Sequence, residues 1–136
     1  MSSTPAHPRG LLDTSVVIAL TGLPGASAVP LEPLICAITL AELSVGPLIA
    51  KSAGDRAARQ AVLQQAEADF DALPFDDRAA RVFGRVAASM RGSGRKVSAR
   101  SYDAMIAAVA IAHDLPLYTM NPADFEGIAD LVVVPV

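Results

Sequence analysis

Four acidic residues of this 136-residue chain stand beside segments that are apolar or have helical periodicity. Asp13 follows a short apolar run, Glu42 and Asp103 come early in helical patterns, and Asp124 comes shortly after the apolar segment 115–119. Two carboxylates about 4 Å apart repel each other by roughly 4 kcal/mol at an effective dielectric near 20. A hard divalent cation relieves such repulsion and keeps ligand positions for water and phosphate oxygens. These acids, if they meet, predict metal-assisted phosphoester chemistry.

Short apolar segments alternate with helical patterns along the chain, and the alternation predicts how the acids are positioned. It favours an α/β fold, a three-layer α/β/α sandwich with a mostly parallel central sheet. Gly46-Pro47 is expected to kink or interrupt the second helix. The expected strands are 11–12, 33–38, 115–119 and 131–136. One helix is expected to start at Asp13, and further helices are expected over 39–48, 55–70, 77–90 and 101–113.

In an open parallel sheet, ligands bind outside the carboxyl ends of the strands. Asp13 directly follows the first strand, and Glu42 and Asp103 are expected in the first turns of helices that begin at that same edge. Asn121 and Asp124 follow the strand 115–119. The side chains are therefore predicted to converge although they are far apart in sequence.

Each acid also has a purely structural explanation. Asp13 can cap the next helix, Thr39-x-x-Glu42 has the spacing of a capping box, and Asp103 and Asp124 suit helix N-termini. The shared edge favours a common site, although α/β topology places every helix start there. Both interpretations therefore stay open at this point.

Composition and length bound the possible classes of protein. A chain of this length, 52% hydrophobic, predicts one folded domain, assigned to residues 10–136 behind a flexible tail at 1–9. The single cysteine, Cys36, excludes an internal disulfide and is expected in the core. The N-terminus lacks the apolar region of a secretion signal and no apolar run is long enough for a membrane span. We therefore expect a soluble cytoplasmic protein without a membrane partner.

Four segments together resemble a PIN-domain ribonuclease of the VapC type, the toxin half of a bacterial toxin–antitoxin pair. Their order and spacing agree with the family over nearly the whole chain. They are Leu11-Leu12-Asp13-Thr14-Ser15, Ile38-Thr39-Leu40-Ala41-Glu42-Leu43, Tyr102-Asp103-Ala104-Met105-Ile106-Ala107-Ala108 and Leu117-Tyr118-Thr119-Met120-Asn121-Pro122-Ala123-Asp124-Phe125.

The resemblance implies an endoribonuclease that depends on Mg²⁺ or Mn²⁺ and cleaves single-stranded or looped RNA through metal-activated water. It further implies a homodimer and a cognate VapB-type antitoxin. Asp13 and Asp103 match the family's principal metal ligands, and Glu42 matches its third acid. Asp124 is favoured as the fourth acid, with Asn121 as a supporting polar contact to metal-bound water or substrate. The supporting side chains are Thr14, Ser15 and Thr119.

Basic residues are concentrated between Arg78 and Arg100, a stretch with seven Arg or Lys and no acid, whereas the rest carries four basic and fourteen acidic residues. Clustered positive charge can bind nucleic-acid phosphates, but it can equally be a solvated helix face. The candidate RNA contacts are Arg81, Arg85, Arg95 and Lys96.

Two other functions are compatible with the same residues. A phosphohydrolase of the haloacid dehalogenase type also begins with an acid after the first strand, but it usually has a second Asp where this chain has Ser15. A catalytically silent α/β binding module would use the acids only as helix caps or as contacts to a partner.

Overall fold

The computed structural model describes residues 7–20, 29–94 and 100–136. Its strands pair in parallel in the order β3-β2-β1-β4-β5. The strands are β1 (Arg9–Leu12), β2 (Glu32–Cys36), β3 (Ala72–Leu73), β4 (Leu117–Thr119) and β5 (Val133–Pro135). The helices are α1 (Thr14–Ala19), α2 (Ala37–Ile49), α3 (Ala53–Asp69), α4 (Asp77–Gly92) and α5 (Ser101–Ala112), with a 3₁₀ turn η4 (Pro122–Phe125).

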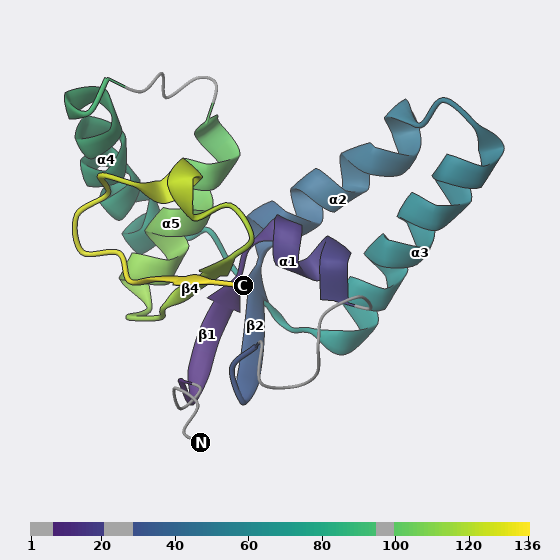
Figure 1. The fold of residues 1–136 in the computed structure, drawn as a ribbon, viewed down its shortest axis with the longest axis horizontal. Coiled ribbons are helices and arrows are strands. Elements are labelled where there is room, and N and C mark those ends of the chain that lie inside the picture. Colours follow the sequence, from purple (N-terminus) through teal and green to yellow (C-terminus); the bar gives the residue numbers. More distant parts are fainter. Residues whose placement is uncertain (1–6, 21–28, 95–99) are drawn as a thin grey trace.

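Helices cover both faces of the sheet (Figure 1). Successive strand residues point to opposite faces. Leu11 accordingly packs with α4 and α5, while its neighbour Leu12 packs with α1, α2 and α3. Cys36 and Ile35 divide between the two faces in the same way. Burial on both sides explains the continuous apolar strands, and the predicted three-layer α/β/α architecture is confirmed.

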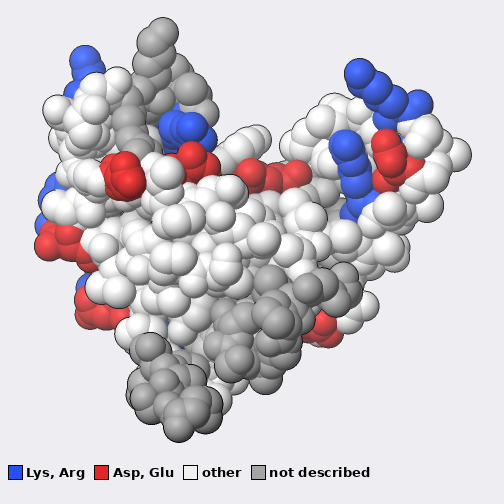
Figure 2. Space-filling model, in the orientation of Figure 1, with Lys and Arg blue, Asp and Glu red and all other residues white. Residues whose placement is uncertain are grey.

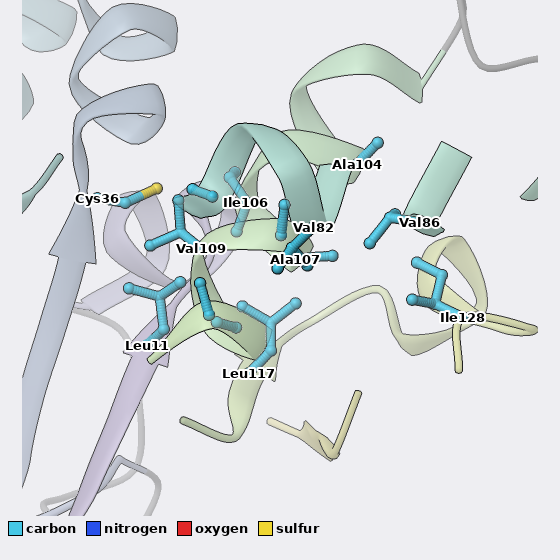
Figure 3. Packing of buried hydrophobic residues seen from close by; sticks show 14 of the residues in the cluster. Leu11, Cys36, Val82, Val86, Ala104, Ile106, Ala107, Val109, Leu117 and Ile128 are labelled. Atoms are coloured by element: carbon cyan, nitrogen blue, oxygen red, sulfur yellow. The ribbon is translucent and has the colours of Figure 1, made fainter. Parts of the chain in front are cut away.

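The core beneath α5 is built around small side chains. Ala104, Ala107 and Ala108 are fully buried, so α5 can approach α4 and the sheet closely. Figure 3 shows Leu11 and Leu117 of the strands facing the residues of this helix. Cys36 is buried in this cluster, and burial raises the pKa of its thiol, which agrees with the predicted core role.

Two local predictions about α2 are wrong. The helix begins at Ala37, with Cys36 as its N-cap, so Glu42 lies in the second turn and forms no capping box with Thr39. The apolar residues 37 and 38 belong to the helix because periodicity cannot separate the end of a buried strand from the start of a buried helix. The helix also continues through Pro47 to Ile49, so the proline does not interrupt it as one of the two predicted outcomes required.

The edges of the fold differ slightly from the expected boundaries. β3 has only two residues, too few to show an alternating pattern in the sequence. At the N-terminus, β1 begins at Arg9, and the carbonyls of His7 and Pro8 accept hydrogen bonds from Leu31 and Glu32. Residues 7–9 of the predicted tail therefore contact β2 or its approach, whereas residues 1–6 lie outside the described part of the chain. No described helix is long and apolar enough to cross a membrane.

Gly10 in β1 gives a test of the packing between β1 and β4. A Cβ there would lie 2.6 Å from Cε1 of the buried Tyr118 and 3.1 Å from Cγ of Pro30. We expect Gly10→Ala to lower the free energy of unfolding by about 1–3 kcal/mol, because the ring must shift in a packed layer. Gly84→Ala is the control, since a Cβ there meets nothing within 4 Å in α4 and should stabilise the helix by about 0.5–1 kcal/mol. Urea unfolding measures both, and equal effects of the two substitutions would contradict the packing argument.

Candidate active site

The carboxylate of Asp13 lies at the carboxyl end of β1, 5% exposed. Its Oδ1 accepts hydrogen bonds from the Ser15 hydroxyl and, as the N-cap of α1, from the backbone N–H of Val16 at 3.2 Å. Its Oδ2 accepts a 2.6 Å bond from the hydroxyl of Thr119, at the end of β4. Three donors from two neighbouring segments therefore compensate the burial of this charge.

The two hydroxyls have a fixed polarity. Ser15 accepts a hydrogen bond from the backbone N–H of Met120 at 3.2 Å, and Thr119 accepts one from the N–H of Asn121 at 2.9 Å. Each hydroxyl has one proton, which it donates to Asp13. Because Oδ1 has two donors and Oδ2 has one, the lone pair available for a further ligand is on Oδ2.

Glu42 is held next to this centre by α1. The hydroxyl of Thr14 lies 2.6 Å from Oε1 of Glu42 and 3.1 Å from the hydroxyl of Thr39, which is completely buried. Thr39 and Glu42 stand three positions apart on α2, so both reach α1 from one face of the helix. Thr39 and Glu42 thus meet at the hydroxyl of Thr14, which positions Glu42, and they do not cap α2.

Asp103 and Asp124 share a basic partner. Asp103 is in the first turn of α5 and Asp124 is in η4. Nη1 of Arg100, the N-cap residue of α5, lies 3.6 Å from Oδ2 of Asp103 and 3.1 Å from Oδ1 of Asp124. Arg100 therefore joins α5 to the segment that follows β4.

The four acids interact electrostatically. Burial, followed by the charges of Asp124, Glu42 and Asp13, raises the pKa of Asp103 to about 6, while Arg100 acts in the opposite direction. Burial and the charge of Asp13 likewise raise the pKa of Glu42, against the hydrogen bond from Thr14. The acids predicted to converge do lie within reach of one another's fields. Within the ranges 7–20, 29–94 and 100–136, however, no three acidic, histidine or cysteine side chains are arranged as a ready-made metal site.

The residues predicted to support the acids or to contact RNA fall into two groups. Thr14, Ser15 and Thr119 are at the acids, whereas Asn121 is exposed and reaches them only through its backbone bond to Thr119. Arg81 and Arg85 are exposed on α4. Nη1 of Arg81 lies 3.7 Å from Oδ2 of Asp77 in the same helix. Arg95 and Lys96 lie outside the described residues.

The acids occupy the floor of a hollow between two raised parts of the molecule. Figure 2 shows red carboxylates along this floor and basic side chains on the raised part at each side. In Figure 1 the raised parts correspond to the pair α4 and α5 and to the pair α2 and α3. A pocket of about 450 Å³ opens beside Glu42, lined also by Thr14, Ile18 and Arg59. Glu42 is thus reachable from solvent.

The comparisons with known proteins agree with this geometry. Residues 10–131 match the PIN domain family. Over 140 aligned residues, covering all of both chains, the sequence is 40% identical to Ribonuclease VapC5 of Mycobacterium tuberculosis. The chain belongs to the PIN-domain family, among the proteins named VapC. It is also 29% identical to Ribonuclease VapC of Rickettsia bellii over 93% of this chain and 95% of that protein.

Two solved structures share the fold. The crystal structure of VapBC-5 from Mycobacterium tuberculosis, a member of the VapBC family of toxin–antitoxin systems, matches with a TM-score of 0.79 and 37% identity. The match covers 95% of this chain and 99% of that chain. FitAcB from Neisseria gonorrhoeae matches with a TM-score of 0.65 and 25% identity, over 90% and 94% of the two chains. The VapC resemblance read from four short segments is therefore confirmed.

Sequence reasoning missed two residues of this VapC site, Thr39 and Arg100. Thr39 was assigned to a capping box, although its spacing from Glu42 also fits a shared helix face. Arg100 was counted in the basic stretch but not in the site, although it stands three positions before Asp103 at a predicted helix start. That spacing indicates an ion pair across one helical turn.

Asp103 gives a pH-dependent prediction for the metal-free protein. Its pKa is higher in the folded chain than in the unfolded one, so its contribution to the free energy of unfolding falls as the pH rises from about 4 to about 6. Asp103→Asn should therefore stabilise the protein at pH 7 by roughly 1–3 kcal/mol and change little at pH 4.

Urea unfolding in EDTA at pH 4, 5, 6 and 7 measures this effect. Asp77→Asn is the matched control, because Asp77 is also in a first helical turn beside an arginine but its side chain is 89% exposed. Its effect should stay within about 0.5 kcal/mol. An Asp103→Asn protein less stable than wild type at pH 7 would contradict the proposed repulsion.

Proposed function

We propose that this VapC protein is a divalent-metal-dependent endoribonuclease that cleaves single-stranded or looped RNA and acts as the toxin of a toxin–antitoxin pair. The observation that carries the proposal is the gathering of Asp13, Glu42, Asp103 and Asp124 at one edge of the sheet, close enough that the charges of the other three contribute to the raised pKa of Asp103. Stable proteins rarely keep such a cluster half-buried without a compensating charge. The names of the relatives, Ribonuclease VapC5 and Ribonuclease VapC, support the reaction class.

The donor set fits Mg²⁺ or Mn²⁺, which prefer carboxylate oxygens. Asp13, through Oδ2, and Asp103 are the proposed metal ligands. When bound, the cation neutralises the acids, draws a phosphodiester to them and makes water more acidic.

The chain's own groups orient the reactants. Ser15 and Thr119 hold the carboxylate of Asp13 in one position, and Thr14 does the same for Glu42. Glu42 orients the attacking water and accepts its proton, a role that its raised pKa favours. In-line attack leaves 5′-phosphate and 3′-hydroxyl ends, and no side chain becomes covalently attached.

The proposed partners follow from the relatives. VapBC-5 is a member of the VapBC family of toxin–antitoxin systems, which supports a VapB-type antitoxin for this chain. Exposed apolar side chains at the end of α2, Leu48 and Ile49, provide surface for a protein partner. A homodimer and a cytoplasmic location remain part of the proposal.

Metal-dependent cleavage by an acid-site variant tests the proposal directly. Asp103→Asn should lower Mn²⁺-dependent RNA cleavage by roughly a hundredfold or more, because the variant loses a carboxylate that would hold the cation that stabilises the transition state. Because the same substitution is expected to stabilise the fold, the loss cannot be attributed to unfolding. Sequencing of RNA ends after incubation with and without Mn²⁺ measures the activity.

Glu67→Gln is the control, since Glu67 is exposed on α3, away from the acids. It should cleave like wild type, and undiminished cleavage by Asp103→Asn would refute the assignment. Release of phosphate from small phosphomonoesters with RNA left intact would instead indicate a phosphohydrolase. A calorimetric titration without a specific Mn²⁺ site would indicate a silent binding module.

The basic face of α4 gives an independent prediction. Replacement of Arg81 and Arg85 together by Glu should weaken RNA binding and reduce the slope of log affinity against log salt by about 2, if both contact phosphates. Fluorescence anisotropy with a labelled RNA at several salt concentrations measures the slope. An unchanged slope would mean that these arginines only form a solvent-exposed face of α4.

A further inference from the structure

Arg100 stands at the acidic floor, and its contacts set the direction of its guanidinium. The ion pairs with Asp103 and Asp124 are both made by Nη1, so Nη2 and Nε are not needed for them. The side chain of Arg100 is 45% exposed, whereas those of Asp103 and Asp124 are 26% and 29% exposed. The Arg100 side chain is therefore the most solvent-accessible of the three.

The anchoring of Arg100 limits the orientations that it can adopt. One carboxylate comes from α5 and the other from η4, so a single nitrogen is fixed from two directions. A guanidinium is planar, and fixing one nitrogen on two acceptors restricts where the other N–H groups point. Two parallel N–H groups match the two free oxygens of a phosphodiester, which a lysine cannot contact in the same way.

The negative charge of the acids suggests a function for the positive charge of Arg100. An RNA phosphate that approaches the floor meets the fields of four carboxylates, the same fields that raise the pKa of Asp103. The cation proposed for Asp13 and Asp103 would compensate part of this charge, whereas the positive group that the structure shows beside Asp124 is Arg100. A positive group beside Asp124 is needed to admit a second phosphate or the far oxygen of the scissile one.

We propose that Arg100 is an RNA phosphate contact at the active site and that Asp124 positions the guanidinium of Arg100. This inference rests on the proposed ribonuclease function. Asp124 then acts on RNA through the guanidinium of Arg100, rather than as a fourth acid of the metal site. This assignment explains why Asp124 lies closer to Arg100 than Asp103 does.

The test compares Arg100→Gln with Arg9→Gln. Arg9 is also half-exposed and paired with an acid, Glu32, but it stands at the amino end of β1, opposite the acids. Binding of a fluorescein-labelled 12-nucleotide single-stranded RNA is measured by anisotropy in EDTA, where no cleavage occurs, at several salt concentrations. Binding of Mn²⁺ alone is measured by calorimetry, and circular dichroism confirms that each variant is folded.

Arg100→Gln should weaken RNA binding by about tenfold and lower the salt slope by about 1, and its Mn²⁺ affinity should be unchanged or higher. Arg100→Lys should recover part of the RNA affinity. Asp124→Asn should weaken RNA binding less than Arg100→Gln, and in the double variant it should add nothing further, because it acts through the same group.

RNA binding by Arg100→Gln equal to that of Arg9→Gln would overturn the proposal. If Arg100→Gln only tightens Mn²⁺ binding, Arg100 is a counter-ion that competes with the metal, and the proposal is also wrong. An effect of Asp124→Asn that adds fully to that of Arg100→Gln would refute the positioning role of Asp124. A failure of the ribonuclease proposal gives a different result. In that case the wild-type protein does not cleave RNA with Mn²⁺, whatever its affinity for RNA.

Discussion

The buried charge of Asp13 is the constraint on which the site depends. A carboxylate that is 5% exposed is costly unless donors compensate it, and the fold provides them from α1 and from the end of β4. The bond from Thr119 exists because β1 and β4 pair in parallel and bring Asp13 beside Thr119. The helix cap and the candidate catalytic acid are therefore one residue, so the structural explanation of Asp13 is compatible with the proposed functional one.

The other acids extend this constraint across the sheet edge. Glu42 and Asp103 are held by different neighbours, Thr14 and Arg100, yet the field of each acts on the other. The resulting repulsion opposes folding, and the energy is recovered when a positive charge arrives. Active sites commonly keep such unfavourable charge because the ligand or the transition state compensates it.

The surrounding architecture converts this local chemistry into an accessible site. The apolar residues of β1 and β2 alternate between two cores, so the sheet is rigid and covered on both faces. The acids lie on the floor between the raised helix pairs (Figure 2). A rigid edge with an open approach suits a long flexible substrate better than a closed pocket does.

Much of this molecule could be predicted from sequence. The apolar strands, the amphipathic helices and the order of elements are local patterns, and the parallel α/β topology then places Asp13, Glu42 and Asp103 at one edge. The start of α2 and the short β3 could not be predicted, because buried strand ends and helix starts share the same apolar pattern. The tertiary structure alone decided the partners from different elements: Thr119 with Asp13, Thr39 beside Thr14, and Arg100 with Asp124. Hydrogen bonds and ion pairs between elements are sensitive to differences of a few tenths of an ångström in distance, and residue spacing along the chain does not encode these distances.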